Sequence, residues 1–162
     1  VDPTTGVLDT TFSPPANNGF NGYVAAIAVN GNSLYVGGGF NSYRGAANAA
    51  KRVAKLDRLT GALDTTFTKP NSGFDDPNDI VRAIAVYGSS VYVGGEFTTY
   101  RGVANSANSL AKLDVTSGNL DTTFSPQGLG ANGTDNVVSA LAATDVVIRE
   151  LAAAGVVGGD CL

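Results

Sequence analysis

The sequence predicts an all-β chain made of tandem four-stranded antiparallel repeats of about 57 residues. Three observations support this prediction. Long motifs recur along the chain, the apolar runs are short, and 21 glycines among 162 residues accompany frequent turn-forming residues. Only 15% of the residues are charged, which suits strands joined by tight turns.

The repetition is the strongest signal. Leu-Asp-Thr-Thr-Phe occurs three times, at residues 8–12, 63–67 and 120–124. Tyr-Val-Gly-Gly occurs twice, at residues 35–38 and 92–95. Aligned without gaps, residues 24–67 and 81–124 are identical at 28 of 44 positions. Such a period indicates a repeat architecture, in which each unit packs on its neighbours.

The first expected strand covers residues 24–29 and is apolar on both faces. A strand without a polar face must be covered on both sides, and its alanines suit a crowded inner position. A turn at residues 30–33 leads to the second strand, which starts at residue 34 and runs into a glycine pair.

The third expected strand covers residues 53–57, where Ala54 and Leu56 face one way and Lys55 faces the other. A turn ending in Gly61 leads to the fourth expected strand, residues 63–67. Units of this length with four strands have the size of β-propeller blades. The two full units lack the 3.6-residue apolar spacing of a helical repeat.

The units resemble the delta-60 repeat family of bacterial β-propeller-type repeats. The resemblance rests on three motifs: Tyr-Val-Gly-Gly-x-Phe, Ala-Lys-Leu-Asp, and Thr/Ser-Gly-x-Leu-Asp-Thr-Thr-Phe. It covers residues 1–142. The resemblance implies a secreted or cell-surface location and no common catalytic residues.

The motifs divide a single array into four parts. Residues 1–12 form the end of a unit, residues 13–67 and 68–124 form two units, and residues 125–162 form a partial, divergent unit. Residues 138–142 match a first strand, but Arg149 and Glu150 stand where the next Tyr-Val-Gly-Gly should begin. A degenerate capping unit, an insertion and a foreign end would each explain this divergence.

Two units and two partial ones are too few to close a propeller ring. Residues 8–12 could complete the blade that starts at Val138, which would make three blades. We therefore expect either a homo-oligomer, in which several chains complete one ring, or a piece of a longer propeller. Exposed blade faces would drive such association.

Composition excludes several classes of function. The chain has no His, its single Cys is Cys161, and its net charge is −4 with ten scattered basic residues. Catalytic Ser-His and Cys-His systems are therefore absent. We expect no nucleic-acid partner and no membrane-spanning segment.

The repeated aspartates Asp9, Asp64 and Asp121, with Asp57 and Asp114, could suggest the carboxylate pairs of glycosidases. An Asp at a fixed place in every unit more simply accepts hydrogen bonds from turn N–H groups. The unrepeated carboxylates Glu96 and Glu150 are the better catalytic candidates, but neither has an evident partner.

A polar and aromatic set follows the second strand in each unit. These ligand-binding candidates are Tyr43, Arg44, Asn48, Tyr100, Arg101 and Asn105, with Asn41 beside them. Aromatic faces and amides could bind glycans or protein. The alternative is that each Tyr packs between blades while each Arg pairs with a repeated Asp.

Asp75, Asp76 and Asp79 form the one oxygen-rich cluster of the sequence, in the linker between the units. No cofactor is expected apart from Ca²⁺, which prefers several oxygens from one loop. A proline-containing surface turn is the alternative.

From the sequence we expect a non-enzymatic extracellular repeat module that acts as a scaffold or as an adhesion and recognition surface. A carbohydrate-binding propeller is the first alternative. A fragment of a glycan-active hydrolase or lyase is the second.

Overall fold

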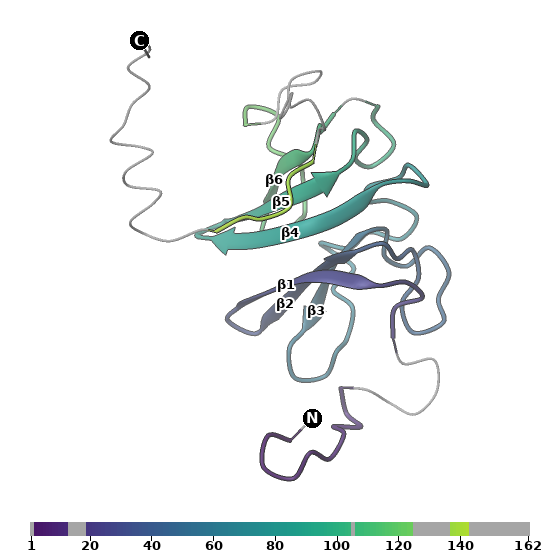
Figure 1. Cartoon of the computed structure of the whole chain (residues 1–162), viewed down its shortest axis with the longest axis vertical. Coiled ribbons are helices and arrows are strands. Elements are labelled where there is room, and N and C mark those ends of the chain that lie inside the picture. Colours follow the sequence, from purple (N-terminus) through teal and green to yellow (C-terminus); the bar gives the residue numbers. More distant parts are fainter. Residues whose placement is uncertain (1, 13–18, 105, 125–136, 143–162) are drawn as a thin grey trace.

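The computed structural model describes residues 2–12, 19–104, 106–124 and 137–142. They form two three-stranded antiparallel sheets, one in each repeat unit (Figure 1). The first sheet contains β1 (Val24–Asn30), β2 (Ser33–Gly38) and β3 (Val53–Asp57), and the second contains β4 (Ile80–Tyr87), β5 (Ser90–Glu96) and β6 (Leu110–Asp114). The described residues contain no helix and hence none that could span a membrane.

The two sheets repeat each other down to their irregularities. β1 pairs with β2 up to Asn30↔Ser33, and the tight turn between them uses Gly31 at φ 56°. The second hairpin has Gly88 at φ 55° in the same place. Glycine adopts this left-handed conformation without a steric cost, so the same turn forms in both units. The register also shifts near the start of both β1 and β4.

The predicted fourth strand is wrong for the described residues, because the sheets stop at three strands. Only the bridges Leu56↔Leu63 and Leu113↔Leu120 continue the pairing. The Oδ1 atom of Asp64 then accepts hydrogen bonds from the N–H groups of Thr66 (2.9 Å) and Phe67 (3.3 Å). An Asp that binds the next backbone groups bends the chain into a turn, and this replaces the sheet pairing.

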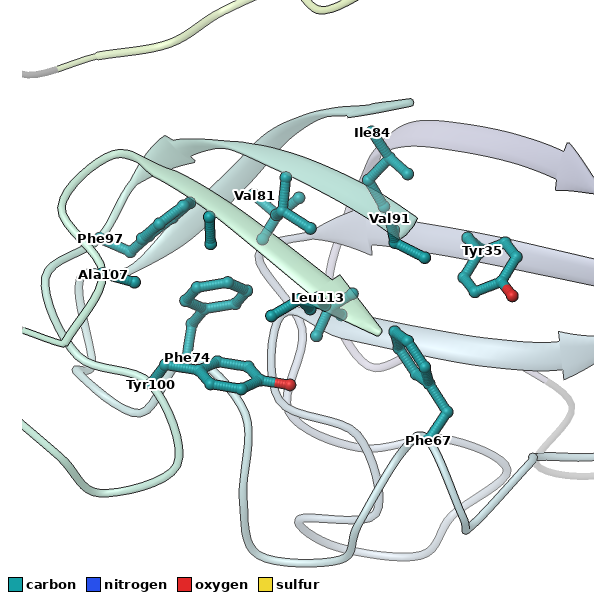
Figure 2. Packing of buried hydrophobic residues seen from close by; sticks show 13 residues of the cluster. Tyr35, Phe67, Phe74, Val81, Ile84, Val91, Phe97, Tyr100, Ala107 and Leu113 are labelled. Atoms are coloured by element: carbon teal, nitrogen blue, oxygen red, sulfur yellow. The ribbon is translucent and has the colours of Figure 1, made fainter. Parts of the chain in front are cut away.

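The two sheets pack side by side, and β4 lies against β1 and β2. One apolar cluster spans both units, from Tyr35 and Phe67 of the first to Phe74, Phe97 and Tyr100 of the second (Figure 2). A second cluster lies within the first unit. The inter-unit interface is therefore core and not a loose contact.

A glycine makes the close approach of the units feasible. A Cβ on Gly37 of β2 would collide with Cγ1 of Val81 and with Cδ1 of Ile84 on β4. The Tyr-Val-Gly-Gly motif thus leaves space for the first strand of the following unit.

The same arrangement recurs at the end of the second unit. A Cβ on Gly94 would collide with Val138, and the N–H of Val138 donates to the carbonyl of Gly95 at 3.2 Å. Residues 137–142 therefore occupy the place that β4 takes on the first sheet, as the sequence match predicted.

Residues 8–12 lie beyond the first sheet, whereas residues 137–142 run along the second sheet (Figure 1). Phe12 packs on the apolar cluster of the first unit. The blade that residues 8–12 were expected to complete with Val138 is not formed by these segments within one chain. The divergent segment 147–162 lies outside the described residues.

Candidate interaction site at the joint between repeats

The two candidate tyrosines are buried. Tyr43 is 5% exposed and Tyr100 is 3% exposed. Their hydroxyls donate to the carbonyls of Gly61 (2.7 Å) and Gly118 (2.6 Å). Burial raises the pKa of Tyr100 to about 12, so its hydroxyl stays protonated. Their rings are packed inside the units, which leaves no open aromatic face for a ligand.

The arginines that follow these tyrosines join one unit to the previous one. Nη2 of Arg44 donates to the carbonyls of Phe12 (2.7 Å) and Thr60 (2.9 Å). Nη2 of Arg101 donates to the carbonyls of Phe67 and Ser117, both at 2.9 Å. Each guanidinium ties the end of the preceding Leu-Asp-Thr-Thr-Phe segment to a turn of its own unit.

The predicted pairing of these arginines with a repeated Asp is therefore wrong. Carbonyl groups of the preceding segment face each guanidinium, and its planar donors fit them without a carboxylate. In the second unit, Nη1 of Arg101 also donates to Oδ1 of Asn119 at 2.8 Å.

The candidate asparagines do not gather around the tyrosines. Asn48 is exposed at φ 56°, and its carbonyl accepts the N–H of Asn71 at 2.8 Å. The side chain of Asn41 accepts a hydrogen bond from Nδ2 of Asn21 at 2.7 Å. Asn105 lies outside the described residues. No shared polar and aromatic ligand surface is built from the described members of the set.

The repeated aspartates hold turns, as predicted. Oδ1 of Asp57 accepts the N–H groups of Leu59 (3.0 Å) and Thr60 (2.7 Å). These bonds, led by the one from Thr60, lower the pKa of Asp57. Asp114 repeats the arrangement in the second unit, with the N–H of Ser117 at 2.7 Å.

Each carboxylate of the acidic linker is bound by the protein. Asp75 faces Nζ of Lys51 at 3.1 Å and accepts the N–H of Gly102 at 2.6 Å. Asp76 accepts the N–H of Asn78 at 3.0 Å, and Asp79 accepts that of Asp76 at 3.1 Å. Across the described ranges, no three acidic side chains converge closely enough to hold a metal ion. The linker thus offers no calcium cage built from these side chains.

The side chain of Arg52 binds the backbone of the linker. Its Nε donates to the carbonyl of Asp79 at 2.6 Å, and its Nη2 donates to that of Pro77 at 3.0 Å. Asp79 is only 5% exposed, and burial raises the pKa of its carboxyl to about 6. The equivalent position in the first unit is Gly22.

A second joint between the units was missed by the sequence analysis. The hydroxyl of Tyr35 and Nζ of Lys55 both donate to the carbonyl of Val115, at 3.0 Å and 3.2 Å. Lys55 also pairs with Asp64 at 2.9 Å. The signal was present in the sequence, because Tyr35, Lys55 and Asp64 all lie in motifs that recur, but their convergence needed the fold.

The two units carry equivalent hollows, one beside Lys55 and the other beside Lys112. The hollow of the first unit, about 220 Å³, is lined by Asn32, Ser33, Lys55, Leu56, Asp57, Ala62, Leu63 and Asp64. The hollow of the second unit, about 300 Å³, is lined by Ser89, Ser90, Lys112, Leu113, Asp114, Asn119, Leu120 and Asp121. Both are open to solvent, and each contains a lysine–aspartate ion pair.

The unrepeated carboxylates form no acid–base pair among the described residues. Oε1 of Glu96 accepts a hydrogen bond from Nε of Arg82 at 2.6 Å, in an exposed ion pair. Glu150 lies outside the described residues.

Comparison with known proteins supports the repeat architecture. The family model described as "Domain of unknown function (DUF5122) beta-propeller" matches residues 32–67 and 90–124, which is one match in each unit. Neither the search of curated proteins nor that of solved structures found a match. The all-β sheets and the paired matches together support β-propeller-type repeats in this chain.

Proposed function

We propose that this chain is a non-enzymatic scaffold and recognition module of the delta-60 repeat type, working in the extracellular space or at a bacterial cell surface. The observation that carries the proposal is the use of the repeated polar side chains. Each of four repeated polar side chains donates to at least one backbone carbonyl, and three of the four bind a carbonyl of a different unit: Tyr100, Arg101, Tyr35 and Lys55. Repeated polar side chains that bind the backbone of a neighbouring unit favour an architectural role.

The unfolding of the chain tests the architectural part of the proposal. Arg101→Ala removes the bonds to Phe67 and Ser117, and we expect it to lower the free energy of unfolding by about 2 kcal/mol. The matched control is Arg82→Ala, because Arg82 makes only an exposed ion pair, worth less than about 1 kcal/mol. Equal stability of the two variants in urea would contradict the architectural role.

Turnover tests the non-enzymatic part. A panel of chromogenic glycosides and polysaccharides should give no saturable activity with the purified chain. An activity that Glu96→Gln abolishes in a folded variant would overturn the proposal and favour the glycan-active alternative.

The repeated hollows favour a second candidate, carbohydrate binding. Each hollow combines hydroxyl or amide groups with a lysine and two aspartates, and these groups suit the hydroxyls of a sugar. A glycan array probed with the full chain tests this idea. Binding should weaken in the double variant Asp64→Asn/Asp121→Asn and persist in Asp76→Asn, which lies in the linker.

A further inference from the structure

The first strand of the first unit has an uncovered apolar face. On β1, Val24 is 42% exposed, Ile27 is 60% exposed and Val29 is 55% exposed. The alanines of the opposite face, Ala26 and Ala28, pack on the cluster of the second unit. One face of β1 is therefore used inside the chain, while the other has no neighbour among the described residues.

The second unit shows which partner fits such a face. Val81 and Ile84 of β4 occupy the positions equivalent to Val24 and Ile27, and they are 0% and 8% exposed. They are covered because Gly37 of β2 leaves room for both side chains. The partner of the β1 face is thus a second strand that carries glycine at this place.

The polar half of the joint repeats as well. Val115, whose carbonyl accepts from Tyr35 and Lys55, is equivalent to Arg58 of the first unit. The N–H of Arg58 donates to the carbonyl of Asn32 at 2.9 Å, and the N–H of Val115 donates to the equivalent carbonyl of Ser89 at 2.9 Å. The two segments therefore share this backbone hydrogen bond. The carbonyl of Arg58 is therefore placed to accept the same two donors.

The other end of the array presents those donors. Tyr92 and Lys112 of the second unit are equivalent to Tyr35 and Lys55. Lys112 pairs with Asp121 at 2.9 Å, while within residues 2–12, 19–104, 106–124 and 137–142 the Tyr92 hydroxyl has no acceptor like the Val115 carbonyl. Gly94 on β5 is covered by Val138, whose N–H donates to the carbonyl of Gly95 at 3.2 Å.

We propose that the β1 face of one copy docks head to tail on the β5–β6 face of a second copy, where it replaces residues 137–142. Val24 and Ile27 then pack over Gly94, and the Arg58 carbonyl meets Tyr92 and Lys112. Both halves of this interface copy the joint that already holds the two units together. The inference deepens the proposed scaffold role by naming its partner as a second copy of the chain. The contact is heterologous, so it extends to rings or open arrays.

Sedimentation velocity of the full chain over a wide concentration range tests the proposal. We expect reversible association that Ile27→Asp weakens about tenfold or more, because a buried unpaired charge costs over 1.4 kcal/mol. The matched control is Val103→Asp, since Val103 is 51% exposed between β5 and β6 and is not a member of the proposed interface, so its substitution should leave association unchanged. A chain that stays monomeric, or association that survives Ile27→Asp, overturns the proposal.

A mixing experiment establishes the direction of docking. Ile27→Asp blocks the β1 face but keeps the β5–β6 face. Gly94→Val blocks the β5–β6 face, because a side chain there would collide with the docked strand as a Cβ on the equivalent Gly37 would collide with Val81 and Ile84. Each variant alone should stay monomeric, and an equal mixture should form dimers and nothing larger. Failure to form dimers would rule out head-to-tail docking, and circular dichroism confirms that both variants are folded. A monomeric wild type overturns only this inference, because the proposed function is tested by unfolding and turnover.

Discussion

β1 and β4 have nearly the same sequence and opposite surroundings. Both contain Val-x-Ala-Ile-Ala-Val, with Ala25 in one and Arg82 in the other. Ile27 of β1 is nevertheless 60% exposed, while Ile84 of β4 is 8% exposed. The same residues on the same kind of strand become surface or core according to whether a neighbouring sheet covers them. Burial in a repeat array thus depends on a unit's place in the array.

The largest expected difference concerns the two isoleucines. Ile84→Ala should lower the free energy of unfolding by about 2–5 kcal/mol, because it leaves a cavity against Gly37 and the cluster around it. Ile27→Ala should cost less than about 1 kcal/mol, since its side chain is mostly in water. Urea unfolding of both variants at a concentration where the chain is monomeric measures the contrast. Equal losses would break the comparison.

The second largest expected effect is a pH dependence of stability, and it comes from the carboxyl group of Asp79, just before β4. Asp79 is buried and its pKa is raised from 3.8 to about 6, whereas Gly22 precedes β1. The native state therefore holds a proton between these pH values that the unfolded chain has lost. Stability should fall by up to about 3 kcal/mol as the pH rises through this window.

Asp79→Asn isolates this contribution. The variant should flatten the decline of stability between pH 4 and 6, because no proton is then lost at this site. Asp76→Asn, in the same linker, should keep most of the dependence. A wild-type stability that rises across this window would show that the buried carboxyl is not the controlling group.

The glycines of the second strands sharpen the comparison further. Gly37→Ala should destabilise the chain by about 1–3 kcal/mol, because the new Cβ collides with Val81 and Ile84 in the core. Gly94→Ala should cost less, since the nearest atoms to a Cβ there belong to Val138, which is not part of the buried apolar cluster. Gly19→Ala is the control, because nothing lies within 4 Å of a Cβ there. Thermal unfolding of the three variants should rank them in this order.

The smallest expected effect concerns the tyrosines of β2 and β5. Tyr35→Phe removes a hydrogen bond to the Val115 carbonyl and should cost about 1 kcal/mol. Among the described residues the Tyr92 hydroxyl makes no such bond, so the stability of Tyr92→Phe should equal that of the wild type. If the two variants lost the same stability in denaturant titrations, the joint at Val115 would contribute nothing specific.

The local structure could be predicted where the chain's own residues decide it. The expected third strand, residues 53–57, coincides with β3, and the expected first strand differs from β1 by one residue. The fourth strand was wrong because the side chain of Asp64 competes for the backbone of the following residues. A pattern of apolar residues does not reveal that competition.

The candidate site was harder to predict. Tyr43 and Arg44 were correctly singled out as a repeated pair, but the sequence does not show that the ring is buried or that the guanidinium binds carbonyls. The joint formed by Tyr35, Lys55 and Val115 was missed, since its members come from separate strands and two different units. Contacts of this kind depend on how the sheets are stacked.

The sequence by itself determined the repeat, the β class and the turns, because each depends on neighbours in the chain. The glycine at the hairpin turn and the aspartate that binds the next N–H groups act within a few residues. Only the tertiary structure decided which apolar faces are covered and which carboxyl is buried. Val24 and Val81 differ in exposure because the stacking of the sheets places Gly37 over one of them and leaves the other open.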